Sequence, residues 1–272
     1  MKLRDCLTHL LLALGGLVMI FPFVWMLSLS LKEEHEIYAS GLALLPAHWD
    51  FANYVEAFRF GAVGTLILNG WIVTLSILAL QLLTVVPAAY VLALKRFRLN
   101  GLMFTLVLAV LLIPPQVTAL PVYLLLAKLG LIDTRAALVI PFATSAFGIF
   151  LLRQVFKTIP QDLLDAARVD GASELQTLWT VAVPLAAPAI AAFALFSVVA
   201  HWNDFFWPLL VIRSLENATP PLGISMFASD EGGSEIGPMM ASATLIVMPL
   251  MIAFVIARRR FIQGIAMTGI KG

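Results

Sequence analysis

Residues 60–94 read FGAVGTLILNGWIVTLSILALQLLTVVPAAYVLAL and contain no aspartate, glutamate, lysine, arginine or histidine. A helix that crosses the hydrocarbon core of a bilayer needs about 20 mostly apolar residues, so this run is long enough to span a membrane. The composition of the whole chain agrees: 61% of its 272 residues are hydrophobic, 12% are charged, and the mean hydropathy is +0.97. Soluble domains carry about 25% charged residues, which excludes an ordinary soluble globular chain.

Six stretches of this kind predict an all-α integral membrane protein with six transmembrane helices. The first apolar run, Leu10–Leu31, is longer than the core of a signal peptide and no A-x-A-like site follows it, so we expect a retained helix. We expect one transmembrane domain over residues 1–272, with spans at about 10–31, 66–94, 102–127, 135–152, 185–212 and 237–257.

The basic residues predict the orientation of the chain. With the N-terminus inside, 12 of the 17 lysines and arginines fall in inside segments. Cytoplasmic loops carry the excess of such residues, so we expect both termini in the cytoplasm. The segment 153–184 and the tail 258–272 are then cytoplasmic.

The segment between the fourth and fifth spans contains IPQDLLDAARVDGASELQTLWTVAVP, residues 159–184. Pro160 suits a first helical turn, Gly171 suits a left-handed helix end, and Ser173 with Gln176 forms a capping-box pattern. This predicts a cytoplasmic helix-turn-helix. Its first helix carries three acids and one arginine, which favours the groove of a soluble protein over an anionic bilayer surface. A plain structural loop is the alternative.

Three parts of the sequence resemble permease subunits of binding-protein-dependent ATP-binding-cassette sugar importers. Asp165-Ala166-Ala167, then Gly171, then Val181–Pro184 matches the spacing of the signature loop of that family, with Asp165 where glutamate is usual and valines at 181 and 183 for isoleucine and leucine. Residues 201–209 are similar to the fifth-helix segment of the sugar permeases. The tail 260–272 is similar to the end of the smaller permease of maltose-type importers.

The resemblance implies partners and a mechanism. The loop is a coupling helix docked on an ATP-hydrolysing subunit, with interface residues Asp165, Ala166, Ala167, Arg168, Asp170, Gly171 and Ala172. The tail contacts the same ATPase pair through Gln263, Gly264 and Lys271. The implied assembly has a second homologous permease, two ATPase subunits and an extracytoplasmic solute-binding protein, embedded in the lipid of a bacterial inner membrane. ATP and magnesium are bound by the ATPases, and no cofactor by this chain.

Polar residues within the apolar runs are candidates for the solute pathway: Asn69, Gln116, Trp202, Asn203 and Asp204. Asp204 is the only acid within an expected span, and an intramembrane carboxylate is by default a functional candidate. It falls near the outer end of that span, where snorkelling or local hydrogen bonding also accounts for it. Trp202 also suits an outer aromatic belt.

The sequence therefore predicts a non-enzymatic permease subunit of an importer for a sugar, polyol or glycerol-phosphate compound. No serine–histidine–aspartate set or metal-ligand cluster stands out, Cys6 is the single cysteine, and Gly264–Gly269 lacks the lysine and serine or threonine of a phosphate loop. The net charge of +1 gives no indication of nucleic-acid binding. An ATP-independent secondary transporter or channel subunit is the first alternative, and a structural membrane adaptor the second.

Overall fold

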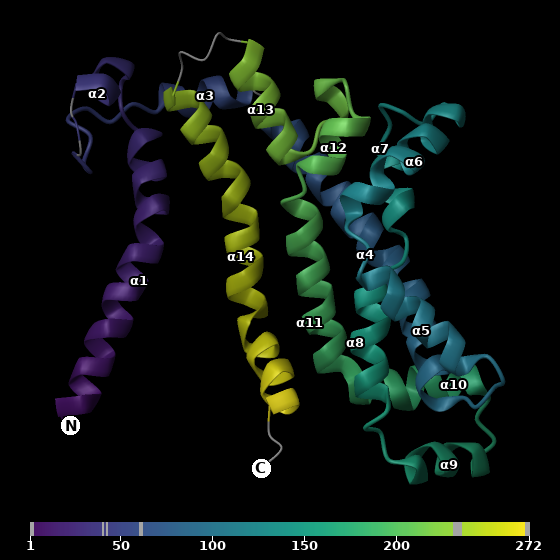
Figure 1. Cartoon of the computed structure of the whole chain (residues 1–272). Helices are drawn as coiled ribbons and strands as arrows, with labels where there is room; N and C mark the ends of the chain where they lie inside the picture. The colour runs from purple at the N-terminus through teal and green to yellow at the C-terminus, as the bar shows by residue number, and fades with distance from the viewer. Residues whose placement is uncertain (1–2, 40, 42, 60–61, 231–235, 270–272) are drawn as a thin grey trace. The chain divides into compact units, whose positions relative to one another are not determined.

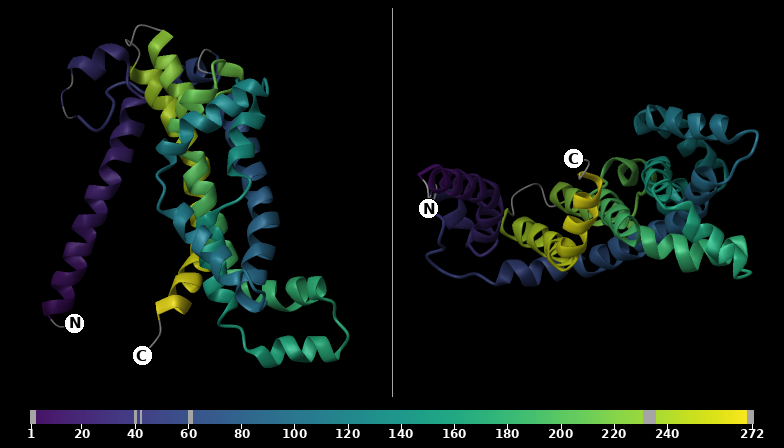
Figure 2. Two further views of the ribbon diagram at one scale, coloured as in Figure 1. Left: turned by 45° about the vertical axis from the view of Figure 1, so that its right-hand side comes forward. Right: turned by 90° about the horizontal axis from the view of Figure 1, so that it is seen from below.

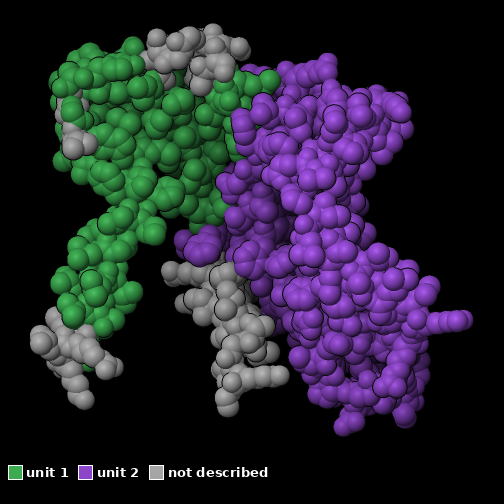
Figure 3. All heavy atoms as spheres, in the orientation of Figure 1, with its two compact units in different colours: residues 1–67, 220–251 green, residues 68–219, 252–272 purple. Residues whose placement is uncertain are grey.

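The computed structural model describes residues 3–39, 41, 43–59, 62–230 and 236–269, without the side chains of residues 3, 4, 6, 227–230 and 256–269, and every regular element among them is a helix (Figure 1). Its contacts divide the chain into two compact units, residues 1–67 with 220–251 and residues 68–219 with 252–272 (Figure 3). Each unit has its own set of helices that pack on one another.

The first unit holds α1 (Leu3–Leu29), α2 (Glu34–Ala39), α3 (Ala52–Arg59), the start of α4 (Val63–Leu94), α13 (Pro220–Asp230) and the first part of α14 (Ile236–Gly269). Asn53 is buried on α3, and its amide donates to the carbonyls of Ser30 and Lys32 at 3.2 and 2.9 Å. A Cβ on Gly237 would lie 2.5 Å from the Asn53 side chain, so α14 approaches α3 closely only because residue 237 is glycine.

The second unit holds most of α4 together with the central helices. In chain order these are α5 (Asn100–Leu111), α6 (Pro115–Lys128), α7 (Arg135–Val139), η1 (Ile140–Phe142), α8 (Ala146–Phe156), α9 (Gln161–Val169), α10 (Glu174–Thr177), η2 (Leu178–Ala182), α11 (Val183–Trp202), α12 (Phe206–Val211) and η3 (Leu215–Asn217). At one end lie α9 and α10, and at the other α6, α7 and α12 (Figure 1).

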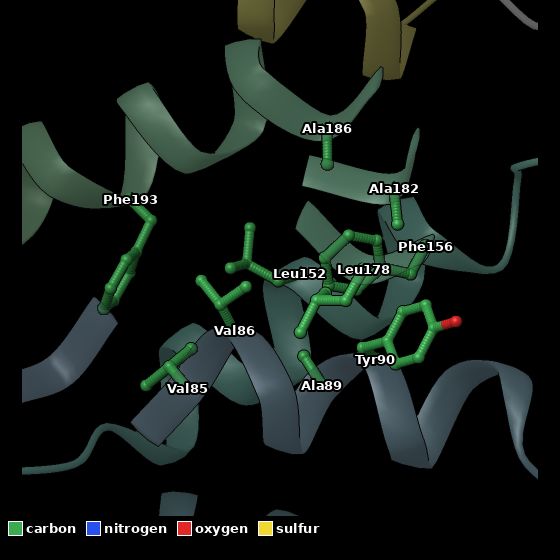
Figure 4. Packing of buried hydrophobic residues seen from close by; sticks show 10 residues of the cluster. All are labelled: Val85, Val86, Ala89, Tyr90, Leu152, Phe156, Leu178, Ala182, Ala186 and Phe193. Carbon is green, nitrogen blue, oxygen red and sulfur yellow. The ribbon is translucent and has the colours of Figure 1, made fainter. Parts of the chain in front are cut away.

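The core of the second unit lies where α4, α8 and the η2–α11 helix meet (Figure 4). Leu152 and Phe156 of α8 are fully buried against valines of α4 and alanines of η2 and α11. Gly148 makes this close approach of α8 and α11 possible, because a Cβ there would lie 2.5 Å from the ring of Phe193. The long apolar runs thus pack as helices against one another.

Five helices in the described residues are long and apolar enough to cross a membrane, and a bent pair brings the number to six. The bent pair, α5 and α6, takes the place of the continuous span expected at 102–127, and its halves meet at 98°. Pro114 and Pro115 account for the break, since proline lacks an N–H and disfavours helix in the residue before it.

The fifth span also differs from the expected 185–212. Its helix is continuous from α10 through η2, a π-helical turn, to the end of α11 at Trp202. In η2 the N–H of Val183 bonds to the carbonyl of Leu178, directly before Pro184, which has no N–H to donate. At the other end, the Asn203 amide donates to the Val199 carbonyl and an Asp204 oxygen accepts from the Trp207 N–H. Such side-chain bonds compete with helix and end it here.

Candidate functional site

The turn between α9 and α10 forms as the sequence predicts. Gly171 has φ of +80°, the left-handed region that glycine adopts without strain. The N–H groups of Gly171 and Ala172 bond back to the carbonyls of Arg168 and Ala167 at 3.0 and 2.9 Å, which caps α9. Ser173 and Gln176 then exchange hydrogen bonds between side chain and backbone, a complete capping box at the start of α10.

Helix α9 has little packing against the rest of its unit, and Figure 2 shows it standing apart from the other helices of that unit. Leu164, 1% exposed, is the one buried residue of α9. Steps of 100° per residue place Ala166 and Val169 on the face opposite Leu164. Val169 is 88% exposed. The outward face of α9 therefore carries short, partly apolar side chains and is exposed to solvent.

A chain of charged contacts links α9 to the end of α4. One guanidinium nitrogen of Arg168 lies 2.7 Å from an Asp165 oxygen, and another lies 3.6 Å from an oxygen of Glu174 on α10. The other Glu174 oxygen pairs with the ammonium of Lys95, just after α4, and accepts from the Tyr90 hydroxyl at 3.1 Å. Glu174 thus joins three segments of the chain.

The end of α4 is itself fixed to its neighbours. Arg153 of α8 donates to the carbonyl of Leu92 at 3.0 Å, and its guanidinium lies 3.5 Å from the centre of the Phe104 ring on α5. The Asn100 amide donates to the carbonyls of Leu92 and Lys95. Last-turn carbonyls that lack helical partners are satisfied in this way, and a cation suits a helix C-terminus.

The interface residues expected from the loop therefore lie together on α9, its cap and the turn. Asp165, Ala166, Arg168, Asp170 and Gly171 are exposed, whereas Ala167 and Ala172 are half-buried. Of the expected tail residues, Gln263 and Gly264 lie in the part of α14 whose side chains are outside the described residues, and Lys271 lies outside them altogether.

At the other end of the second unit is a cavity of about 360 Å³. It lies between α6, η1, the end of α11 and α12, and Gln116, His201 and Asp204 are among its lining residues. Two of the expected pathway residues, Gln116 and Asp204, thus come together although they are far apart in sequence. Phe142 and Trp207 supply aromatic surface, and the Trp207 indole is held by a 2.9 Å hydrogen bond to the carbonyl of Ala137.

The other three expected pathway residues do not line the cavity. Asn69 is fully buried, and its amide donates to the carbonyls of Glu216 and Ala218 at 2.7 and 3.0 Å. Trp202 is 2% exposed and packs on Trp71 with 4.9 Å between ring centres. Asn203 is exposed and donates to its own helix. These contacts hold helices in place.

His201 belongs to the cavity and was not among the pathway residues expected from sequence. Its ring tilts against Phe142, with 4.9 Å between the centres, and its Nε2 lies 3.3 Å from the amide nitrogen of Gln81. The signal in the sequence is a histidine and a glutamine, each interrupting an apolar run. Only the fold shows that they meet. In the described part of the chain, no group of three or more histidine, cysteine, aspartate or glutamate residues could hold a metal ion.

Comparison with known proteins identifies relatives over nearly the whole chain. Residues 85–267 match the family model described as "Binding-protein-dependent transport system inner membrane component". The arabinooligosaccharides transport system permease protein AraQ of Bacillus subtilis is 32% identical over 260 residues, which are 94% of this chain and 92% of that protein. The sn-glycerol-3-phosphate transport system permease protein UgpE of Pectobacterium atrosepticum is 28% identical over 268 residues, 96% and 95% of the two chains.

The fold has a solved counterpart as well. A crystal structure of a bacterial ABC transporter involved in the import of the acidic polysaccharide alginate contains a similar chain. The TM-score is 0.81 at 25% identity, over 95% of this chain and 96% of that one.

Proposed function

Because the chain belongs to the family of binding-protein-dependent transport system inner membrane components, we propose that it is a permease subunit of an ATP-driven importer for a carbohydrate or related solute. Its relatives carry the names of glycerol-phosphate, arabinooligosaccharide and alginate transport systems, which sets the range of solutes. The alternative of an ATP-independent transporter or channel gains no support from these relatives. A second homologous permease completes the translocation pathway.

Helix α9 is the dock for the ATPase in this proposal. Its outward face carries Ala166 and the 88% exposed Val169, so a partner can approach closely, and Asp165 and Arg168 lie at its sides. When two ATPase subunits close around ATP, they move α9. The contacts from Arg168 through Glu174 to Lys95 carry that movement to α4. The weak packing of α9 leaves its outward face open to a partner, and the contacts through Glu174 tie it to α4.

The remaining partners follow from the same arrangement. Twelve of the 17 lysines and arginines fall in the two ends, the 95–98 loop and segment 153–184 taken together, which supports a cytoplasmic location for α9 and the termini. ATP and magnesium are then bound by the ATPases on that side, where Gln263, Gly264 and Lys271 are further contact candidates. The cavity near α12 lies at the other end of the unit, on the side of the solute-binding protein.

The observation that carries the proposal is an exposed helix at the family's signature loop, tied to the bundle by one buried leucine and one chain of ion pairs. The test is a pull-down of the tagged chain from its native membrane in mild detergent, with identification of the co-purifying proteins. We expect an ATPase and a second permease.

Two matched variants locate the dock. Ala166→Trp adds a bulky side chain on the outward face of α9 and should lose the ATPase while the second permease is retained. Gln154→Trp adds the same side chain at an exposed position of α8 and should keep both. A chain that purifies alone contradicts the importer, and an A166W variant that retains the ATPase contradicts the dock on α9.

A further inference from the structure

The cavity beside α12 contains a histidine whose protonation pattern is fixed by its neighbours. The Gln81 side-chain amide lies 3.1 Å from the carbonyl of Phe142, and its oxygen accepts from the Ser197 hydroxyl at 2.7 Å. A carbonyl only accepts, so the Gln81 atom that faces Phe142 is the nitrogen, which carries two hydrogens. This orients the amide in one way.

The second hydrogen of that nitrogen points to the imidazole of His201. The two nitrogens, Gln81 Nε2 and His201 Nε2, are 3.3 Å apart, and since the amide nitrogen donates, the imidazole nitrogen accepts. The proton of neutral His201 therefore resides on Nδ1. No described residue accepts a hydrogen bond from Nδ1, and His201 is among the residues that line the cavity.

The other polar groups of the cavity complement this donor. Asp204 accepts from the Trp207 N–H at 3.3 Å and from the Phe206 N–H, and a carboxylate has further acceptor sites beyond those bonds. The amide of Gln116 on α6 can both donate and accept. The rings of Phe142 and Trp207 stand edge to face, 6.1 Å between centres, and provide apolar aromatic surface. Donors, acceptors and aromatic faces thus converge on one volume.

These features select a class of ligand. A sugar ring has hydroxyl groups that donate and accept, and a face of C–H groups that packs on aromatic rings. The volume of about 360 Å³ lies within the range of small-molecule sites. Of the described side chains that line the cavity, the two ionisable ones are the Asp204 carboxylate and the His201 imidazole, whose Nε2 accepts from Gln81 and so carries no proton. A phosphate or uronate would face the like charge of Asp204.

We infer that this cavity is a binding site for a neutral, hydroxyl-rich ring, in which His201 donates and Asp204 accepts. This inference rests on the proposed function, because the site would lie on the pathway of that importer. The relatives are named for both charged and neutral solutes, and the site favours the neutral ones. In this site His201, Asp204 and Gln116 contact the solute, and Gln81 positions His201.

The test uses the assembled importer, permeases with ATPase, in lipid nanodiscs without the solute-binding protein. The probes are methyl glucoside and methyl glucuronide, which differ only in the group at C6. Saturation-transfer difference NMR measures weak contacts of each probe with the complex. We expect signals from the glucoside that exceed those from the glucuronide. His201→Phe should weaken the glucoside signals about three- to tenfold, as expected for the loss of one hydrogen bond.

Two further variants make the result specific. His201→Asn keeps an N–H donor at the same position and should restore most of the glucoside signal. Thr105→Val alters an exposed hydroxyl of α5, which donates to the Gly101 carbonyl and is not among the lining residues, and should leave the signal unchanged.

Glucuronide signals equal to or above those of the glucoside overturn the inferred class, and glucoside signals that His201→Phe leaves unchanged overturn the site. A preparation that contains no ATPase contradicts the proposed function instead, so the two failures are distinguishable.

Discussion

Helix α9 and the core around Gly148 belong to the same unit but are held in very different ways. In the core, ten buried residues of α4, α8, η2 and α11 pack on one another, and a Cβ at Gly148 has no room (Figure 4). Helix α9 has one buried residue, Leu164, and a chain of ion pairs at its end. The difference separates a rigid body from a part that can move relative to it at low cost. Substitutions in the two regions should therefore fail in different ways.

The largest effect is expected in the core. Gly148→Val places side-chain atoms where the Phe193 ring lies 2.5 Å from the Cβ position and Val85 lies 3.0 Å from it. Overpacking of this kind costs about 1–3 kcal/mol of folding free energy, and more where neither helix can move. We expect loss of folded subunit, measured by fluorescence-detected size exclusion and by melting in detergent. Gly101→Val on α5, with nothing within 4 Å, should melt like the parent, and equal melting of both variants would contradict close packing at Gly148.

The next effect is expected in the turn after α9, and it should spare the fold. Gly171 has φ of +80° with nothing within 4 Å of a Cβ, so valine there strains the turn without a clash. That strain is about 1–2 kcal/mol, enough to shift α9 from its dock and lower uptake about tenfold while the subunit still assembles. Gly130→Val, with φ of +68° and equally open, carries the same strain after α6 and should import normally. Normal ATP-driven uptake by the G171V variant would refute the coupling role of this turn.

A smaller effect is expected where the two regions meet. Glu174→Gln removes the charge that Lys95 and Arg168 share, so α9 should move with less effect on α4. Altering one residue between two coupled sites changes their coupling free energy by about 0.5–2 kcal/mol. We therefore expect the E174Q variant to import fewer solute molecules per ATP hydrolysed, at an unchanged melting temperature.

The charge-reversed pair Lys95→Glu with Glu174→Lys restores the contact and should recover part of the loss. Lys157→Gln, which removes an exposed charge before α9, should leave the ratio unchanged. If E174Q imports with the parent's ratio of solute to ATP, the movement reaches α4 by another route.

The smallest effect is expected at Asp133, in the turn after α6 at the end opposite α9. Partial burial raises the pKa of Asp133, but hydrogen bonds from the backbone of Arg213 and from Ser214 and Asn217 outweigh it and hold the pKa below its ordinary 3.8. The folded pKa is the lower one, so this stabilisation is present above about pH 4 and is lost as the pH falls through the folded value. Asp133→Asn should lower the melting temperature slightly at pH 7, and the difference should shrink as the pH falls below about 4. A difference that stays constant with pH would mean that the charge of Asp133 is not involved.

The sequence predicts the all-helical class and the local signals of the loop well, because these depend on nearby residues. The Gly171 turn and the Ser173–Gln176 capping box are set within a few residues, and the structure confirms both. The long apolar runs likewise become helices. The bend between α5 and α6 was visible only as two adjacent prolines, which predict a break but not its angle of 98°.

The cavity and the ionic link could not be predicted in the same way, since they depend on how distant segments pack. Gln81 and His201 are 120 residues apart, and Tyr90 and Glu174 are 84 apart. Asn69 and Trp202 are candidates for the solute pathway from sequence, as polar or aromatic groups within apolar runs, but the structure places both in helix packing. A polar residue in a span indicates a partner, but only the fold shows whether that partner is the chain's own backbone or a cavity.

The most direct test of the account is to ask what the outward face of α9 touches. A photo-reactive benzoylphenylalanine at Val169, 88% exposed on that face, should form an adduct with the co-expressed ATPase when the membranes are illuminated. The same group at Leu120, 64% exposed on α6 at the other end of the unit, should not. An ATPase adduct from position 169 alone is the predicted result. No ATPase adduct from position 169, or an equal yield from position 120, would contradict the claim that α9 is where ATP hydrolysis acts on this subunit.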